Sequence, residues 1–317
     1  MTPDAPATAQ AHDAPAQQLT AERGQSGAEA RNGGPPVPAA PSAGPVPELS
    51  TPADLRRLTT RPSSARVCNW FLRGKDNYPV DADLARQLLD AAAFLRHAAA
   101  INRAYAKSTI AFLVRRGITQ FIDLGCGLPV YPALYETAAG LLPEGTGVTV
   151  AYVDHDPIVM AHTSALLTPA PPHRTVHVRA DLAHPEQILT DPTLLNALDL
   201  SQPVGLLAHA VLHELPDHQA YPTLQAFTRS LPPGSALSLT HPTADLRPTP
   251  MNTVAALSAR AGLTPFFRSR DQIGHLFGGW NVLGPGLTET AHWHPGNTAA
   301  AYPAGTSAAY AAIALNP

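Results

Sequence analysis

The sequence predicts an α/β fold built on a mostly parallel β-sheet. After Gly117, short apolar runs rich in Val, Ile and Leu alternate with helical stretches, which is typical of repeated strand-helix-strand units. The first apolar run leads into a glycine-rich turn, as expected where a parallel strand opens a ligand-binding loop. Together these observations favour one Rossmann-like sheet with helices on both faces.

The strands and helices of this sheet can be placed in order along the chain. Seven segments have the length and composition of strands: residues 119–124, 148–153, 175–178, 204–208, 236–240, 281–283 and 310–315. Helical patterns fill the gaps at residues 132–141, 157–166, 185–198, 221–231, 249–261 and 270–277. Several of them begin with Pro in the first turn, where its missing N–H costs no hydrogen bond.

Two regions of different character precede the sheet. Residues 1–52 are rich in Ala, Pro, Gly and Ser and contain no aromatic residue, so they bury too little apolar surface to offset the entropy of folding. We predict that this tail is disordered. Residues 53–117 carry apolar side chains at spacings of three and four, which predicts an N-terminal helical lid segment. The Rossmann-like domain is expected over residues 118–317.

Composition excludes several classes of partner. The net charge is -3 and the basic residues form no cluster, so the chain lacks the electrostatic footprint of a nucleic-acid-binding protein. No apolar run approaches the length of a bilayer-spanning helix, and the chain opens without a signal peptide. The two cysteines imply no disulfide framework. We therefore expect a cytoplasmic protein without nucleic acid, membrane or metal partners; the oligomeric state stays open.

The turn after the first strand carries the strongest local signal, FIDLGCGLPV at residues 121–130. Asp123 ends the strand, and Gly125 and Gly127 permit a tight turn with close approach of a ligand to the backbone. A dinucleotide fingerprint would place a third glycine where Val130 stands. An Asp-x-Gly-x-Gly turn suits a ligand with an ammonium group and no phosphate, although another Rossmann-like site remains an alternative.

Acidic residues also follow the second and third strands. Asp154 is placed to accept hydrogen bonds from both hydroxyls of a ribose. Asp156, just before a proline, is expected to cap the next helix. After the third strand, Asp181 could accept from an adenine amino group while Leu182 packs on the ring; an exposed loop acid is the plainer alternative. Because carboxyl ends of parallel strands share one edge, Asp123, Asp154 and Asp181 should converge.

Histidines suggest the acceptor side of the site. His209 and His213 stand four apart, a spacing that can hold zinc on a helix, but the segment begins as a strand and no third ligand is marked. The run 209–217 is better interpreted as a loop lining the reaction site. His213, or His241 in the loop after the fifth strand, could act as a general base there. Ordinary pocket-lining histidines are the alternative.

Over residues 63–317 the sequence resembles a group of bacterial S-adenosylmethionine-dependent methyltransferases formerly described as a domain of unknown function. The resemblance lies in several segments that occur together and in order: ARVCNWFLRGKDNYPVD, INRAYAKSTIAFL, QFIDLGCGLP, AYVDHDPIVMAH, RADLAHPEQIL, AVLHELPD and RSRDQIGHLFGGWNVLGPGLTETAHWHP. It departs from the family pattern at Arg73 and at Glu214, where family members often have a glycine and an aromatic residue. Glu214 puts a shared substrate in doubt.

The resemblance implies a class I methyltransferase fold, with a seven-stranded sheet whose last strand is antiparallel. It also implies that Asp123 and its glycines surround the methionine part of the cofactor, that Asp154 holds the ribose, and that Asp181 with Leu182 meets the adenine. Lys75 and Arg103 fall in two further family segments, and either could pair with the cofactor carboxylate. A structural salt bridge is the alternative for both.

The sequence therefore predicts a methyltransferase that uses S-adenosyl-L-methionine and acts on a small-molecule methyl acceptor, such as a secondary metabolite. A protein that binds this cofactor without turnover is the first alternative, because the acceptor side cannot be interpreted from sequence. An NAD(P)-dependent oxidoreductase is the second, disfavoured by the missing third glycine and by Asp123.

Overall fold

The structure is a computed structural model that describes residues 52–294 and 302–317 of the 317-residue chain. The predicted disordered tail lies outside these residues, apart from Pro52. Four helices precede the sheet: α1 (Pro52–Thr59), α2 (Ser64–Phe71), α3 (Pro79–Ala91) and α4 (Leu95–Val114).

The sheet carries the order expected of a Rossmann-like methyltransferase fold. Its strands are β1 (Gln120–Leu124), β2 (Thr149–Asp154), β3 (Arg174–Arg179), β4 (Gly205–His209), β5 (Ala236–Pro242), β6 (Asn281–Val282), β7 (Thr288–Glu289) and β8 (Ala309–Leu315). They are ordered β3-β2-β1-β4-β5-β8-β6, with β7 paired to β8. The first five strands are parallel and β8 is antiparallel to β5, which confirms the predicted fold class. The sheet has one strand more than the seven predicted, namely β7, which has only two residues and is therefore too short to be recognised from an apolar pattern.

The remaining helices mostly connect these strands. They are α5 (Leu134–Ala139), α6 (Pro157–Leu166), α7 (Pro185–Leu189), α8 (Pro192–Ala197), α9 (Asp217–Ser230), α10 (Pro248–Arg260) and α11 (Arg270–His275), with the 3-10 turns η1 (Leu212–Glu214) and η2 (Thr290–His292). The helix predicted over 185–198 is split, because Asp191 caps a new helix at Pro192. β5 continues two residues past its predicted end, because it pairs with β8 as far as Pro242.

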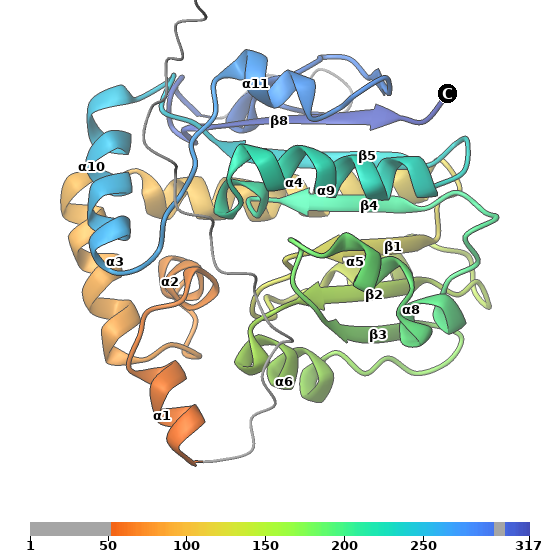
Figure 1. Ribbon diagram of the computed structural model, residues 1–317. Coiled ribbons are helices and arrows are strands. Elements are labelled where there is room, and N and C mark those ends of the chain that lie inside the picture. Colours follow the sequence, from red (N-terminus) through yellow and green to blue (C-terminus); the bar gives the residue numbers. More distant parts are fainter. Residues whose placement is uncertain (1–51, 295–301) are drawn as a thin grey trace, which may run out of the picture. The chain divides into compact units, whose positions relative to one another are not determined.

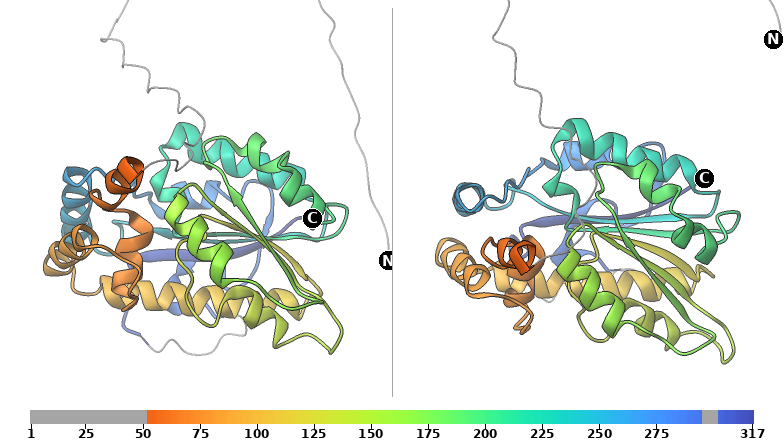
Figure 2. Two further views of the ribbon diagram at one scale, coloured as in Figure 1. Left: turned by 90° about the horizontal axis from the view of Figure 1, so that it is seen from below. Right: turned by 60° about the horizontal axis from the view of Figure 1, so that its bottom comes forward.

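Each face of the sheet has its own hydrophobic core. One contains Ile122, Leu206 and Leu239 with side chains of α7, α8, α9 and α11. The other contains Phe121 and Leu207 with side chains of α4 and α5. Figure 2 shows α4 and α9 on opposite sides of the sheet. Successive side chains along a strand point alternately into one core and the other, so only every second residue of a strand lies on a given face of the sheet.

The helices α2 and α3 pack away from the sheet, in a third cluster with α10. In Figure 1 the arrowheads of β2 and β4 point toward the side of the molecule where α2, α3 and α10 lie, whereas β8 points the other way. These helices therefore stand beyond the carboxyl ends of the parallel strands, which we call the carboxyl edge of the sheet.

A buried ion-pair network fastens α2 to this edge. The Arg66 side chain is 1% exposed, and its Nε donates to Asp81 of α3 at 2.8 Å. Its Nη1 donates to Asp156 in the loop after β2 at 3.3 Å, and Ser63 Oγ donates to the same carboxylate oxygen at 3.0 Å. The other oxygen of Asp156 caps α6 through Ile158 N, which confirms the predicted cap.

Substituting Arg66→Met should destabilise the protein strongly. The change leaves the carboxylates of Asp81 and Asp156 without their buried cation, and breaking a buried pair in this way costs about 3–5 kcal/mol of unfolding free energy. For a domain of this size that corresponds to a drop in Tm of about 10 °C. Thermal unfolding followed by circular dichroism measures it.

The matched control is Arg86→Met, since Arg86 pairs with Asp83 on α3 where both side chains are more than half exposed. An exposed pair contributes less than about 1 kcal/mol, so the Tm should barely move. Equal Tm values for the two variants would contradict the structural role given to Arg66.

Candidate active site

Side chains from three strands point to one face of the carboxyl edge. Phe121, Tyr152 and Leu207 belong to the core under α4, and side chains two residues further along a strand share the same face. Asp123, Asp154 and His209 occupy those positions at the ends of β1, β2 and β4. The three groups therefore face the layer that contains α4, around the strands where the sheet order reverses.

The turn after β1 needs both of its predicted glycines, for different reasons. Gly125 has φ +62°, and a Cβ there would come within 2.2 Å of Val211 Cγ2, so this glycine lets the loops after β1 and β4 pack together. Gly127 has φ +63°, and a Cβ there would meet no atom within 4 Å. Its backbone therefore borders open space, where a ligand could approach closely.

Asp154 is held in place by the backbone of this turn. One carboxylate oxygen accepts from Gly127 N at 3.0 Å and the other from Asp156 N at 2.9 Å. Each oxygen keeps a further lone pair. Burial raises the pKa of Asp154, while the two backbone hydrogen bonds lower it. The arrangement leaves a fixed bidentate acceptor at the tip of β2.

Asp123 is a buried carboxyl without a hydrogen-bond donor. The residue is 7% exposed, and no described residue donates a hydrogen bond to it. Burial raises its pKa to about 7; Asp154 adds to the rise, and Arg103 opposes it. A cation beside this carboxyl would favour its ionised form, so the position suits a ligand ammonium group.

Arg103, on α4, faces the same place. Its Nη2 donates to Val130 O at 2.5 Å and to Pro132 O at 3.0 Å, in the loop after β1. Its Nε is buried and has no hydrogen-bond partner. A guanidinium is suited to pair with a carboxylate, and Arg103 would do so through this N–H once a ligand or a side-chain movement made it accessible.

Arg103, Asp123 and Gly127 line a small pocket with a cavity volume of about 20 Å³, partly open to solvent. Cys126 and Tyr152 are also among its walls. Pockets for drug-sized ligands begin at about 300 Å³, so this pocket does not enclose a cofactor by itself and marks only one end of a site that opens to solvent. The carboxyl and the guanidinium in its wall are complementary in charge to the ammonium and the carboxylate of an amino-acid end.

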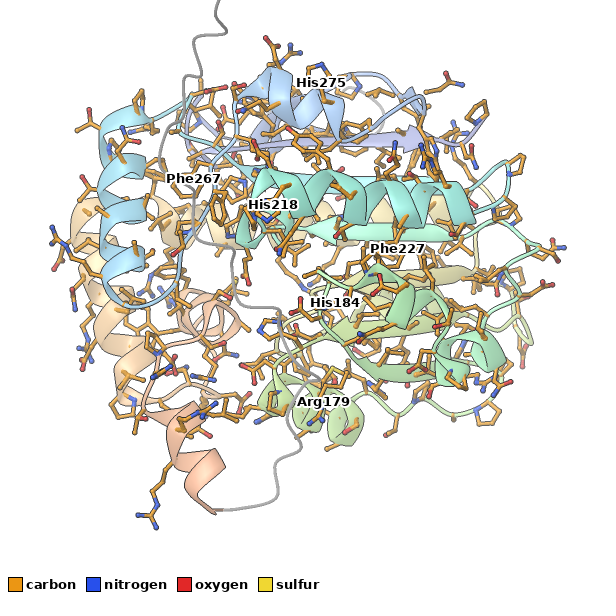
Figure 3. The ribbon with its side chains drawn as sticks, viewed as in Figure 1. Arg179, His184, His218, Phe227, Phe267 and His275 are labelled. Atoms are coloured by element: carbon orange, nitrogen blue, oxygen red, sulfur yellow. The ribbon has the colours of Figure 1, made fainter. Side chains whose placement is uncertain are left out.

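Asp181 and Leu182 lie in the loop after β3, between Arg179 and His184, which are labelled in Figure 3. One oxygen of Asp181 accepts from Ala183 N at 2.9 Å, and the other makes no hydrogen bond with a described residue. Leu182 is 7% exposed and belongs to the core under α7 and α9, so only a small part of its side chain can reach a ligand.

The structure shows no contact between Lys75 and the other predicted site residues. It is exposed in the loop after α2, and the structure gives it no hydrogen bond or ion pair with a described residue. The loop itself is organised around Asn69: Asn77 Nδ2 donates to Asn69 Oδ1 at 2.9 Å, and a Cβ on Gly74 would come within 2.4 Å of the Asn69 side chain.

His213 and His241 lie together, but their surroundings differ. His241 is 0% exposed and sits within β5 instead of the predicted loop. Its Nδ1 donates to Pro242 O at 2.7 Å, and its Nε2 accepts from Arg268 at 2.9 Å, so neither nitrogen is left to bind a substrate.

His213 lies in η1 with its ring 6.1 Å from that of His241. Burial and Arg268 lower its pKa to about 4, so it is neutral at pH 7.

Arg268, which sequence reasoning missed, fixes this region. It is 2% exposed and donates to Leu212 O at 2.9 Å and to Leu215 O at 2.8 Å, which holds the η1 turn. It also pairs with Asp217 at the start of α9. Its partners lie more than 25 residues away along the chain, so no local pattern could have revealed them.

His209 and His213 do not converge on a metal. His209 Nε2 contacts Ser238 Oγ at 2.8 Å on the face covered by α4, whereas His213 neighbours Arg268 and His241. Within residues 52–294 and 302–317, no group of three or more His, Cys, Asp or Glu side chains is placed to hold a metal ion.

Cys68 and Glu214 also approach the carboxyl edge, from α2 and η1. Both side chains are accessible to water, but protein atoms surround them closely, and this burial raises the pKa of each group. The pKa of the Cys68 thiol rises to about 11. Arg103 and Glu214 act on the Cys68 thiol electrostatically, and Asp154 and His155 act on the Glu214 carboxyl. The α2 helix therefore lies close to the loops after β2 and β4.

Fold and site together define a Rossmann-like protein for a nucleoside cofactor with an amino-acid end. The chain belongs to the S-adenosyl methyltransferase family, whose match covers residues 52–317. It is therefore an S-adenosylmethionine-dependent methyltransferase, as the sequence predicted. The cofactor fits the observed groups, because a ribose, an ammonium and a carboxylate each find a complementary side chain in Asp154, Asp123 and Arg103.

Two solved structures resemble this chain over nearly their whole length. A DUF574 family protein from Streptomyces avermitilis is 33% identical, with a TM-score of 0.77, covering 82% of this chain and 99% of its own. A putative methyltransferase from Thermobifida fusca is 29% identical, with a TM-score of 0.75, covering 85% of this chain and 99% of its own. Comparison with curated proteins gave no match. No helix in the described part of the chain is long and apolar enough to cross a membrane.

Binding of S-adenosylhomocysteine at pH 6 should release protons from Asp123. The free protein holds this carboxyl mostly protonated, since its pKa is about 7, and the ligand ammonium then favours the ionised form. An α-amino group with a pKa near 7.7–8 stays protonated at pH 6, so about 0.5–1 proton should leave per ligand bound. Calorimetric titrations in buffers that differ in ionisation enthalpy measure the number of protons released per ligand bound.

Asp123→Asn should remove this release, and Asp199→Asn, which changes an exposed acid, should keep it. A binding enthalpy of the wild-type protein that does not depend on the buffer would contradict the placement of the ammonium at Asp123.

Proposed function

We propose that this enzyme transfers the methyl group of S-adenosylmethionine to a small molecule, such as a secondary metabolite, bound between α2 and the loops after β4 and β5. The observation that carries the proposal is that Cys68 of α2 and Glu214 of η1 lie near enough to interact electrostatically across this region, each accessible to water but closely surrounded. An acceptor site walled by a helix on one side favours a small ligand over a flat macromolecular surface.

In the proposed cofactor site each group has one task. Asp154 accepts hydrogen bonds from the ribose hydroxyls, and Asp123 and Arg103 hold the ammonium and the carboxylate of the methionine part. Gly125 and Gly127 let the cofactor approach the turn. Asp181 offers its free oxygen to the adenine amino group, with the exposed edge of Leu182 beside the ring. Lys75 is exposed on a loop, where it would bind the cofactor carboxylate only if that loop moved inward.

On the acceptor side, His213 is the stronger candidate of the two predicted histidines. Its Nε2 makes no hydrogen bond and, unlike Nδ1, is not sealed from water. His241 packs near His213 and cannot itself bind the acceptor, because Arg268 and Pro242 form hydrogen bonds with both ring nitrogens of His241. Neutral at pH 7, His213 can orient an acceptor hydroxyl or amine and take its proton as the new bond forms.

The bound cofactor supplies a methyl group on a positively charged sulfur, which an acceptor lone pair attacks in line. The protein aligns the two reactants and excludes water, and alignment of this kind accounts for much of the rate of such transfers. The Arg66 network contributes by holding α2 near the carboxyl edge.

Methyl-labelled S-adenosylmethionine, incubated with this enzyme and fractions of a cell extract, should label the small-molecule fraction and leave protein and RNA unlabelled. With the labelled acceptor in hand, His213→Gln should lower kcat about 100-fold, which is the low end of general-base effects because the pKa of His213 lies well below pH 7. The affinity for S-adenosylhomocysteine should not change.

His218→Gln is the matched control, because His218, labelled in Figure 3, is exposed on α9. It should keep the wild-type kcat. Label in protein or RNA would overturn the acceptor class, and a His213→Gln enzyme with full activity would remove His213 from the reaction.

A further inference from the structure

His209 ends β4 and has been given no role in the proposed cofactor or acceptor site. It lies on the same face of the sheet as Asp123, one strand away, because Asp123 pairs with Leu207. The charge of Arg103 acts on its imidazole. The Tyr105 ring packs edge-on against the imidazole, with centroids 5.4 Å apart.

His209 contacts a cluster of hydroxyl groups under α4 through its Nε2. The hydroxyl of Tyr105 has one hydrogen, which it donates to Ala312 O at 2.9 Å. Ser238 Oγ is placed to donate its single hydrogen either to the Tyr105 hydroxyl at 3.1 Å or to Thr109 Oγ1 at 3.3 Å. When Ser238 donates to either of these hydroxyls, the 2.8 Å contact to His209 Nε2 has Nε2–H as donor, and this is the tautomer on which the inference is built.

The other nitrogen, Nδ1, is then an unprotonated acceptor. Burial and Arg103 keep the ring neutral, with a pKa lowered to about 3. Nδ1 makes no hydrogen bond with a described residue, and it is not sealed from water as Arg103 Nε and His213 Nδ1 are. In this tautomer Nδ1 presents a lone pair at the carboxyl edge, on the same face of the sheet as Asp123, whose carboxyl accepts no hydrogen bond from a described residue.

We infer that His209 accepts a hydrogen bond through Nδ1 from the ammonium group of S-adenosylmethionine, as a second acceptor beside Asp123. The inference rests on the proposed cofactor site. An ammonium has three N–H donors, more than one carboxyl can satisfy in a confined space. His209 is then a residue that recognises the amino-acid end of the cofactor and takes no part in binding its nucleoside.

The test compares two ligands that share the nucleoside. S-adenosylhomocysteine carries the ammonium, and 5′-methylthioadenosine lacks the whole amino-acid end. In calorimetric titrations of the full chain, His209→Leu should weaken S-adenosylhomocysteine by about 10-fold or more, as expected for a lost hydrogen bond to a charged group, and 5′-methylthioadenosine by less than about 3-fold. His209→Asn places an amide oxygen near the position of Nδ1, so it should restore most of the affinity.

Three results would overturn the inference. His209→Leu could bind S-adenosylhomocysteine as tightly as the wild-type protein does. It could weaken both ligands by the same factor, which would indicate a structural role. His209→Asn could fail to restore affinity although it folds with a wild-type Tm. If the wild-type protein itself bound no S-adenosylhomocysteine, both the proposed cofactor site and this inference would be wrong. If the wild-type protein binds it normally and the His209 variants bind it equally well, only the inference is wrong.

Discussion

The bridge from Arg66 to Asp81 and Asp156 is the interaction on which the arrangement of the site depends. A guanidinium that is 1% exposed is tolerated in a protein only when its donors are satisfied, and here two carboxylates and two backbone carbonyls accept from it. Because Asp156 also caps α6 and follows Asp154 by two residues, one network holds the N-terminal helices, the start of α6 and the proposed ribose acceptor together.

The alternation of side chains along the strands then separates the proposed cofactor groups from the proposed acceptor groups. Asp123, Asp154 and His209 point to the face covered by α4, where Arg103 and Tyr105 meet them. His241 points to the other face, where Arg268 occupies it and holds the η1 turn that carries His213. Both sets lie at the ends of neighbouring strands, so groups with different roles can be near each other without competing for the same partners.

Much of this could be predicted from sequence, because it follows from local pattern. The five parallel strands, the cap at Asp156 and the turn at Gly125 and Gly127 depend on neighbours a few residues away. The contacts of Arg66 and Arg268 could not be predicted, because their partners are up to 90 residues distant. His241 was expected in a loop since its strand appeared to end at residue 240; pairing with the distant β8 extends that strand and turns the side chain away from the proposed cofactor site.

A crystal structure with S-adenosylhomocysteine tests the central claim most directly, that the carboxyl edge binds the cofactor through the acids at the ends of β1 and β2. The account predicts both ribose hydroxyl oxygens within about 3.2 Å of the Asp154 carboxylate and the amino nitrogen beside Asp123. A ribose bound elsewhere, or an amino-acid end directed away from Asp123 and Arg103, would contradict it.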